Sequence, residues 1–258
     1  MNLDPYLEFA HTLADTAGRI ARMYFRTPYD VAIKKDATPV TIADREIEHA
    51  LRALIRERFP SHGIIGEESD AVKPDAEYAW VLDPIDGTKA FMAGRPTFGV
   101  LIALCYQRVP ILGIIDQPVN GERWVGAKDR PTLLNDQPVT VRPCSSLDRA
   151  VLATTSPTLF PSIERAAFES ICKKIHYPIF GGDCYDYALL ATGGIDLIIE
   201  SGLKPYDMMA LVPIIEGAGG IITDWEGDPI TLDSDGHTLA SGDNVIHSQV
   251  LHILNSVS

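Results

Sequence analysis

The segment from Trp80 to Thr88 limits the possible folds of this chain more than any other. It reads Trp-Val-Leu-Asp-Pro-Ile-Asp-Gly-Thr, an apolar run that meets one acid at Asp83 and a second at Asp86. The run predicts a buried strand that stops at Asp83. Pro84 and Gly87 predict a tight turn that brings Asp86 back toward Asp83. Two carboxylates held that close repel each other unless a cation lies between them.

Thr88 follows the expected turn. It offers a hydroxyl and backbone N–H groups, which suit a phosphate at the start of a helix. The alternative is an Asp-rich turn whose side chains cap their own backbone. The segment alone leaves both interpretations open.

Acids also stand at the ends of two other expected elements. Glu67 and Glu68 follow the apolar run Ile64-Ile65-Gly66, and Asp207 stands at the start of an expected helix. Oxygen ligands from three such ends suit Mg²⁺ better than zinc or copper. Asp207 alone fits an N-cap equally well. The seven histidines show no metal-ligand spacing.

The spacing of apolar residues changes along the chain and predicts two halves. Two amphipathic helices come first, over Asp4–Phe25 and from the near capping box at Thr41–Asp44 to Pro60. An antiparallel meander of short strands follows, over Gly63–Gly66, Ala79–Leu82, Gly99–Tyr106, Ile111–Ile115, Arg123–Ala127 and Val139–Val141. Strands and helices then alternate, with strands at Val151–Thr154, near Ile179, at Ile195–Ile199 and Ile221–Thr223, and helices at Ile163–Lys174, Tyr185–Ala191, Met208–Ala218 and Ile246–Val257. We expect an α+β half over residues 1–142 and an α/β half over residues 143–258, packed in layers.

Composition excludes several classes of function. The formal net charge of −13 argues against non-specific binding to nucleic acids or anionic membranes. The four cysteines contain no Cys-x-x-Cys pair, which disfavours a zinc knuckle and a disulfide scaffold. The N-terminus lacks a signal-peptide pattern and no apolar run is long enough to span a bilayer, so we expect a cytoplasmic protein. There is no P-loop motif and no Gly-x-Ser-x-Gly elbow.

Three motifs together resemble the inositol monophosphatase family of Mg²⁺-dependent, lithium-sensitive phosphatases. They are Gly66-Glu67-Glu68, Asp83-Pro84-Ile85-Asp86-Gly87-Thr88, and Tyr206-Asp207 with Glu216-Gly217-Ala218-Gly219-Gly220. The resemblance covers nearly the whole chain and implies a layered αβαβα sandwich of the inositol monophosphatase/fructose-bisphosphatase type. One departure is Tyr206, where the family usually has Trp.

Within the family, the chain looks most like the histidinol-phosphate phosphatase branch. The segments that carry this likeness are Thr38–Asp44, Phe59–Gly66, Gly202–Asp207 and above all Gly182-Asp183-Cys184-Tyr185. The likeness implies hydrolysis of L-histidinol phosphate to L-histidinol and phosphate in histidine biosynthesis. The alternatives are an inositol-1-monophosphatase or a 3′(2′),5′-bisphosphate nucleotidase of the same family, and more remotely a non-catalytic binding protein with this fold.

The resemblance also implies roles for individual residues. The ligands of two or three Mg²⁺ ions are Glu67, Asp83, the carbonyl of Ile85, Asp86 and Asp207. Asp44 and Thr88 orient and deprotonate the attacking water, although Asp44 could equally stabilise a helix start. Gly87 and Thr88 bind the phosphate, Asp183 and Glu200 meet the substrate amine, and Lys34 or Lys35 reaches the site on a mobile loop. Asp183 has a helix-capping alternative. The family implies a homodimer.

Overall fold

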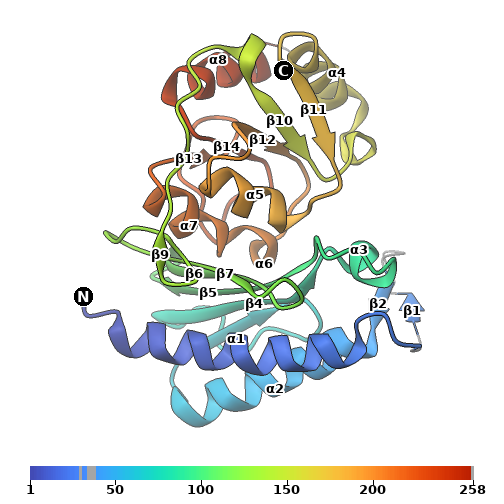
Figure 1. The fold of residues 1–258 in the computed structure, drawn as a ribbon. Coiled ribbons are helices and arrows are strands. Elements are labelled where there is room, and N and C mark those ends of the chain that lie inside the picture. Colours follow the sequence, from blue (N-terminus) through green and yellow to red (C-terminus); the bar gives the residue numbers. More distant parts are fainter. Residues whose placement is uncertain (29–30, 34–38, 257–258) are drawn as a thin grey trace.

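The structure is a computed structural model that describes residues 1–28, 31–33 and 39–256 (Figure 1). Lys34 and Lys35 lie outside these residues. Five layers follow one another from the bottom to the top of Figure 1: a helix pair, a seven-stranded sheet, a middle helix layer, a five-stranded sheet and an outer helix pair. The layered αβαβα sandwich is therefore confirmed.

The first sheet has the strand order β3-β4-β5-β6-β7-β8-β9. Its strands are β3 (Gly63–Gly66), β4 (Tyr78–Asp86), β5 (Gly99–Tyr106), β6 (Val109–Gln117), β7 (Glu122–Ala127), β8 (Leu133–Leu134) and β9 (Gln137–Pro138). The predicted antiparallel meander is confirmed from β4 onward. It is wrong for β3, which runs parallel to β4 with Gly66 opposite Leu82. The parallel pairing brings Glu67, the residue after β3, and Asp83, a residue within β4, to the same place along the sheet.

The predicted strand Val139–Val141 is wrong. The N–H groups of Val139 and Val141 donate to the carbonyls of Thr132 and Ala218, at 3.0 Å in each case. These bonds go to two different segments, so they do not form a ladder with a single neighbour. Apolar alternation over three residues cannot distinguish the two arrangements.

The second sheet has the order β11-β10-β12-β14-β13. Its strands are β10 (Val151–Thr154), β11 (Tyr177–Phe180), β12 (Leu197–Glu200), β13 (Ile221–Thr223) and β14 (Thr238–Ser241). β10 is parallel to β11 and β12, whereas β14 is antiparallel to β12 and β13. β14 was not predicted, because its residues include only one bulky apolar side chain, Leu239. The short antiparallel pair of β1 (Val31–Ile33) and β2 (Pro39–Thr41) was not predicted either.

The helices divide among the three helical layers. The outer pairs are α1 (Asp4–Tyr24) with α2 (Ile42–Arg58), and α4 (Ser162–Cys172) with α8 (Asn244–Asn255). The middle layer holds α5 (Cys184–Ala191), α6 (Pro205–Met208) and α7 (Leu211–Gly217). The short helix α3 (Thr88–Met92) follows β4, and two 3₁₀ turns span Leu147–Arg149 and Pro157–Leu159. The single helix predicted over Met208–Ala218 is divided into α6 and α7. Pro213 has no N–H to donate to the carbonyl of Met209, so an uninterrupted helix would leave that carbonyl without its bond.

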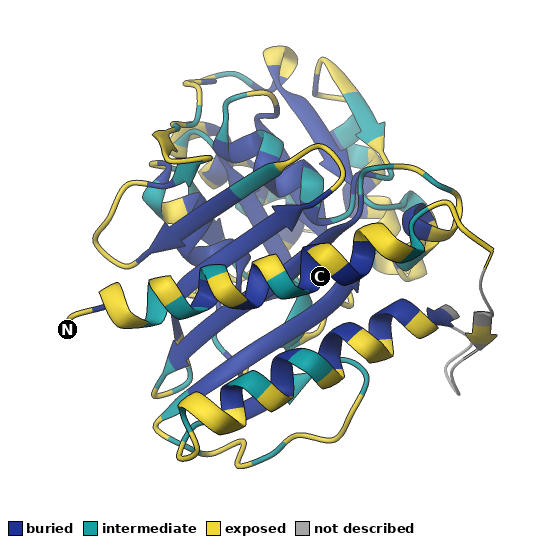
Figure 2. Cartoon of the chain, turned by 60° about the horizontal axis from the view of Figure 1, so that its bottom comes forward, coloured by how far each residue is buried: buried dark blue, intermediate teal, exposed yellow. Residues whose placement is uncertain are grey.

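Three apolar cores join these layers. The helices α1 and α2 bury one face against the first sheet and expose the other (Figure 2). The middle core takes residues from both halves of the chain, Trp124 and Ile215 among them. A third core lies between the second sheet and α4 and α8. The division of the chain at residue 142 stays a prediction. None of the described helices has the length and apolar character needed to cross a membrane.

Candidate metal and phosphate site

The end of β4 is a β-bulge and not the turn that we expected. Asp83 lies opposite Leu101 and Asp86 lies opposite Gly99, so one extra residue of β4 is accommodated between them. The strand therefore continues past Asp83 to Asp86. The N–H of Ile85 donates to Oδ1 of Asp83 at 3.0 Å, which fixes the carboxylate against its own backbone.

Asp207 joins these two acids from the middle helix layer. One carboxylate oxygen from each of Asp83, Asp86 and Asp207 lies within 4.8 Å of the other two. Asp207 also accepts a hydrogen bond from the N–H of Lys204 at 2.7 Å, so its side chain caps α6 as well. The N-cap residue of α6 is Lys204, so the expectation that Asp207 is itself the N-cap is wrong. Asp207 accepts from the backbone of that N-cap residue, and its carboxylate still belongs to the acidic group.

The three carboxylates of this group repel one another. Burial, with repulsion from the neighbouring acids, raises the pKa of Asp83 well above 3.8. Burial raises the pKa of Asp86 and of Asp207 to about 7, and each of these two carboxylates adds to the repulsion. Such a group is stabilised by a cation. Since every donor is an oxygen, the set fits a hard cation such as Mg²⁺.

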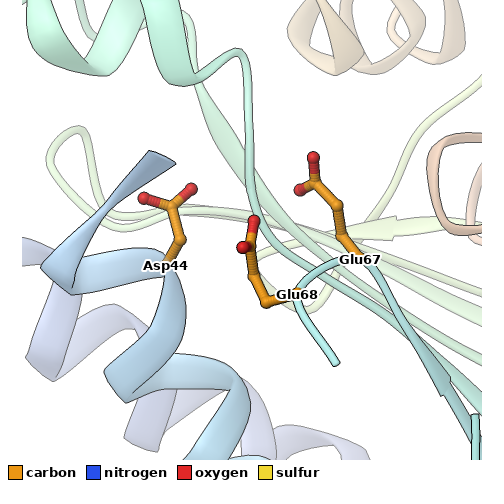
Figure 3. A group of neighbouring side chains, drawn as sticks. All are labelled: Asp44, Glu67 and Glu68. Carbon is orange, nitrogen blue, oxygen red and sulfur yellow. The ribbon is translucent and has the colours of Figure 1, made fainter. Parts of the chain in front are cut away.

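A second acidic group lies beside the first. Carboxylate oxygens of Asp44, Glu67 and Glu68 approach within 4.8 Å of one another, from the start of α2 and from the segment after β3 (Figure 3). Burial raises the pKa of Asp44, and the charge of Glu67 raises the pKa of Asp44 and of Asp83. Glu67 therefore connects the two groups. Sequence reasoning assigned no role to Glu68, although the Glu-Glu doublet was a signal for it.

Asp44 caps the start of α2 and also lies beside Thr88. Its Oδ2 accepts from the N–H of Thr41 at 2.8 Å, which completes a capping box at the start of α2. Its Oδ1 lies 3.5 Å from Oγ1 of Thr88. The Thr88 hydroxyl also lies 3.2 Å from the carbonyl oxygen of Ile85. The structure thus brings together the predicted water-activating pair and the predicted carbonyl ligand.

Asp183 occupies the N-cap position of α5 but does not cap it. Its φ is +50° and its ψ is −139°, a region that glycine occupies readily and other residues rarely. The side chain makes no capping hydrogen bond, so the capping alternative is wrong for this carboxylate. A Cβ on Gly87 would lie 2.8 Å from Oδ2 of Asp183, and the N–H of Cys184 donates to Asp86 at 2.6 Å. The end of β4, with Gly87 after it, and the start of α5 are therefore in direct contact.

The half-buried Asp183 is one of three carboxylates in the second half of the chain whose pKa values are raised, and the other two, Asp186 and Glu200, are buried. Burial raises the pKa of Asp183, Asp186 and Glu200 to about 7 in each case. Glu200 ends β12 and accepts from the N–H of Thr155 at 2.5 Å. Sequence reasoning missed Asp186, which packs so closely under Gly182 that a Cβ there would lie 1.9 Å from its Oδ1.

Comparisons with known proteins show which family the whole chain resembles. The model of the inositol monophosphatase family matches residues 2–258. The chain is 48% identical to a "Bifunctional phosphatase IMPL2, chloroplastic" of Arabidopsis thaliana, over 98% of this chain and 75% of that protein. It is 33% identical to a "Histidinol-phosphatase" of Chlorobaculum parvum, over 95% of this chain and 94% of that protein. A solved inositol monophosphatase from Zymomonas mobilis superimposes with a TM-score of 0.91 at 47% identity, over 99% of each chain.

The match extends over nearly the whole length of the chain, and the fold and the acidic groups agree with it. The chain belongs to the inositol monophosphatase family of metal-dependent phosphatases.

Proposed function

We propose that this protein is a Mg²⁺-dependent phosphomonoesterase that hydrolyses L-histidinol phosphate to L-histidinol and phosphate. The observation that carries the substrate assignment is the half-buried, strained and non-capping Asp183 beside the end of β4. Residues held in rare backbone conformations persist only where the surroundings enforce them, and they cluster at functional sites. A glycine would fit this backbone without strain, so we attribute the presence of an aspartate here to a role of its carboxylate.

The metal end of the site consists of Glu67, Asp83, the carbonyl of Ile85, Asp86 and Asp207. When bound there, Mg²⁺ polarises the phosphate ester and lowers the pKa of a bound water. Without such a cation, these carboxylates would repel a phosphate dianion. Two or three ions per site stay a prediction.

The proton-handling end consists of Asp44 and Thr88. Their oxygens lie 3.5 Å apart, so one water can contact both. A carboxylate whose pKa is raised by burial is a stronger base than an exposed one. Asp44 then accepts the proton of the attacking water, and Thr88 orients that water. The N–H groups of Gly87 and Thr88 donate to the phosphate.

The leaving-group end favours a cation. Glu200 is buried and Asp183 is half-buried, and the negative charge of Asp183 adds to the rise in the pKa of Glu200. A substrate ammonium group beside them stabilises both ionised forms. An inositol ring carries only hydroxyls and leaves both charges uncompensated. The named histidinol-phosphatase relative supports this choice.

Inositol phosphate is the second candidate, because the solved structure at 47% identity is named an inositol monophosphatase. A homodimer, a cytoplasmic location and inhibition by Li⁺ stay predictions from the resemblance.

A substrate panel with two Asp183 variants tests the proposal. Asp183→Gly removes the carboxylate and relieves the backbone, whereas Asp183→Asn keeps the size and removes the charge. A charge-assisted hydrogen bond contributes about 1.5–3 kcal/mol, so we expect kcat/KM for histidinol phosphate to fall roughly 10- to 150-fold in both variants. Inositol phosphate is the matched control substrate, and its hydrolysis should be unchanged or faster.

Stability separates the outcomes. Asp183→Gly should melt at or above the temperature of the wild type, because glycine accepts the positive φ. If hydrolysis of histidinol phosphate and hydrolysis of inositol phosphate fall together, Asp183 does not bind the substrate amine. If the wild type prefers inositol phosphate, the second candidate replaces the first.

A further inference from the structure

A buried ion pair on α2 lies under the segment that carries Glu67 and Glu68. Glu48 and Arg52 are one helical turn apart, and their side chains are only 1% and 5% exposed. Nε of Arg52 donates to Oε1 of Glu48 at 2.7 Å. A pair at this spacing in a sequence normally indicates a solvated helix face. Here the structure buries it completely.

The remaining polar atoms of the pair bind the backbone after β3. Oε2 of Glu48 accepts from the N–H of Glu68 at 2.7 Å. Arg52 donates to the carbonyl of Ser69 at 2.8 Å and to that of Asp70 at 3.1 Å. Three consecutive residues are thereby fixed by two side chains from another element.

Gly66 shows how closely this contact is made. A Cβ at this position would lie 2.6 Å from Cδ and from Oε2 of Glu48. The absence of a side chain at Gly66 lets the carboxylate lie directly beneath the backbone that leads into Glu67.

Stability alone does not explain an ion pair here. Removing two charges from water is expensive, and well-packed apolar residues of similar volume are often as stabilising as a buried ion pair. The guanidinium group of Arg52, whose N–H groups form a planar fork, and the two oxygens of Glu48 instead make directional hydrogen bonds, which apolar side chains cannot make. The pair therefore specifies where the segment lies.

We propose that Glu48 and Arg52 are positioning residues that set the Mg²⁺ affinity of the site by fixing the backbone that carries Glu67 and Glu68. The inference rests on the proposed function, in which Glu67 binds Mg²⁺. Neither residue of the pair is assigned as a ligand. Their action is on the placement of the acids above them.

Arg52→Met gives the sharpest test, because loss of the positive charge and loss of the positioning bonds change the Mg²⁺ affinity in opposite directions. Removing a positive charge near a cation site would by itself tighten Mg²⁺ binding. Loss of positioning weakens it, and changes to residues that orient metal ligands typically weaken affinity about 10- to 100-fold. The measurement is the Mg²⁺ dissociation constant of the substrate-free protein, from calorimetric titration and from the Mg²⁺-induced change in melting temperature.

Arg56→Met is the matched control. Arg56 lies one turn further along α2, is exposed, and carries the same charge. Its replacement should leave Mg²⁺ affinity unchanged or slightly tighter. A weaker affinity in Arg52→Met alone supports positioning.

Two milder variants keep the proposal testable if Arg52→Met does not fold. Arg52→Lys keeps the charge but cannot form the fork, and Gly66→Ala displaces the Glu48 carboxylate. Both should weaken Mg²⁺ binding, while KM for the substrate at saturating Mg²⁺ stays unchanged. Wild-type Mg²⁺ affinity in a folded Arg52→Met or Arg52→Lys would overturn the positioning role alone. If Glu67→Gln leaves Mg²⁺ binding unchanged, the proposed metal site itself is wrong.

Discussion

Asp83→Asn is expected to act in opposite directions on the metal-free protein and on the enzyme. Asp83 is 2% exposed and lies among the other acids of the first group. The amide oxygen of asparagine can still accept from the N–H of Ile85, as Oδ1 of Asp83 does at 3.0 Å. The change therefore removes a charge while keeping the shape and the local hydrogen bond.

The size of the effect follows from the two neighbours. A carboxyl whose pKa rises from 3.8 to about 7, as for Asp86 and Asp207, is destabilising by about 4 kcal/mol in its ionised form at pH 8. Burial causes the largest part of each change. The repulsion that the substitution removes is the one that acts on Asp83 itself, from Glu67, Asp86, Asp207 and Asp44. Since Asp86 and Asp207 are partly exposed, we take that repulsion as a fraction of the figure above. We expect the variant to gain about 2 kcal/mol of stability without metal. For a chain of this size, the gain corresponds to a rise in Tm of about 4–8 °C.

Mg²⁺ should reverse the order of stability. At 100 times its dissociation constant, a ligand stabilises the folded state by about 2.7 kcal/mol. Mg²⁺ should stabilise the wild type by about this amount. In Asp83→Asn most of this stabilisation should be lost, and the phosphatase activity should be lost with it. Scanning calorimetry at pH 8, in EDTA and in Mg²⁺, measures both effects.

Asp196→Asn is the matched control. Asp196 is also fully buried, but it pairs with Arg142 at 2.5 Å and accepts from the N–H of Val151 at 2.7 Å. Its replacement should lower Tm and leave the Mg²⁺ gain intact. If metal-free Asp83→Asn melts at or below the wild type, or keeps the full Mg²⁺ gain, the electrostatic reasoning is refuted.

Three further predictions concern pH, the base and the metal. The raised folded-state pKa values of Asp86 and Asp207 mean that their ionisation destabilises the fold, so the metal-free protein should lose stability as pH rises from 6.5 to 8. Mg²⁺ should remove the share of this loss that comes from Asp86 and Asp207, and the share from Asp183, Asp186 and Glu200 should remain. His247, whose pKa burial lowers to about 4, opposes the loss only below about pH 6.5, and a flat metal-free melting profile would contradict the account. Asp44→Asn should keep the fold and the Mg²⁺-induced gain in Tm but lower kcat about 10²- to 10⁴-fold, whereas loss of that gain would make Asp44 a ligand instead of a base. EDTA should stop phosphate release and Mg²⁺ should restore it, and Li⁺ should inhibit; activity that persists in EDTA would rule out the metal mechanism.

Much of the fold was predictable because local periodicity reports burial. The bounds of β3, β5, β10 and β13 agree with the sequence prediction, since each is an apolar run between turn residues. The direction of β3 was not predictable, because an apolar run of four residues reads the same in a parallel and an antiparallel pair. Pro213 was visible in the sequence and could have predicted the break between α6 and α7.

The candidate site shows the same division. The acids at the ends of β3 and β4 and at the start of α6 were singled out from the sequence, since a charge that interrupts an apolar pattern is conspicuous. The strain at Asp183 was not visible, because no local pattern indicates a positive φ at an aspartate. The same holds for Glu48 and Arg52, whose spacing is that of an ordinary surface pair.

By itself, the sequence determined which segments form helices and strands and which acids stand at their ends. These properties depend on side chains a few residues apart, so a linear pattern records them. Tertiary structure alone decided that Glu67 emerges beside Asp83, that the Asp207 carboxylate reaches the same space, and that the pair on α2 lies under the metal segment. Each of these contacts joins residues on different elements, and their distance depends on strand direction, on one bulge and on how the layers pack. The acids are therefore fixed locally, but the charge density that makes them a site exists only in the folded chain.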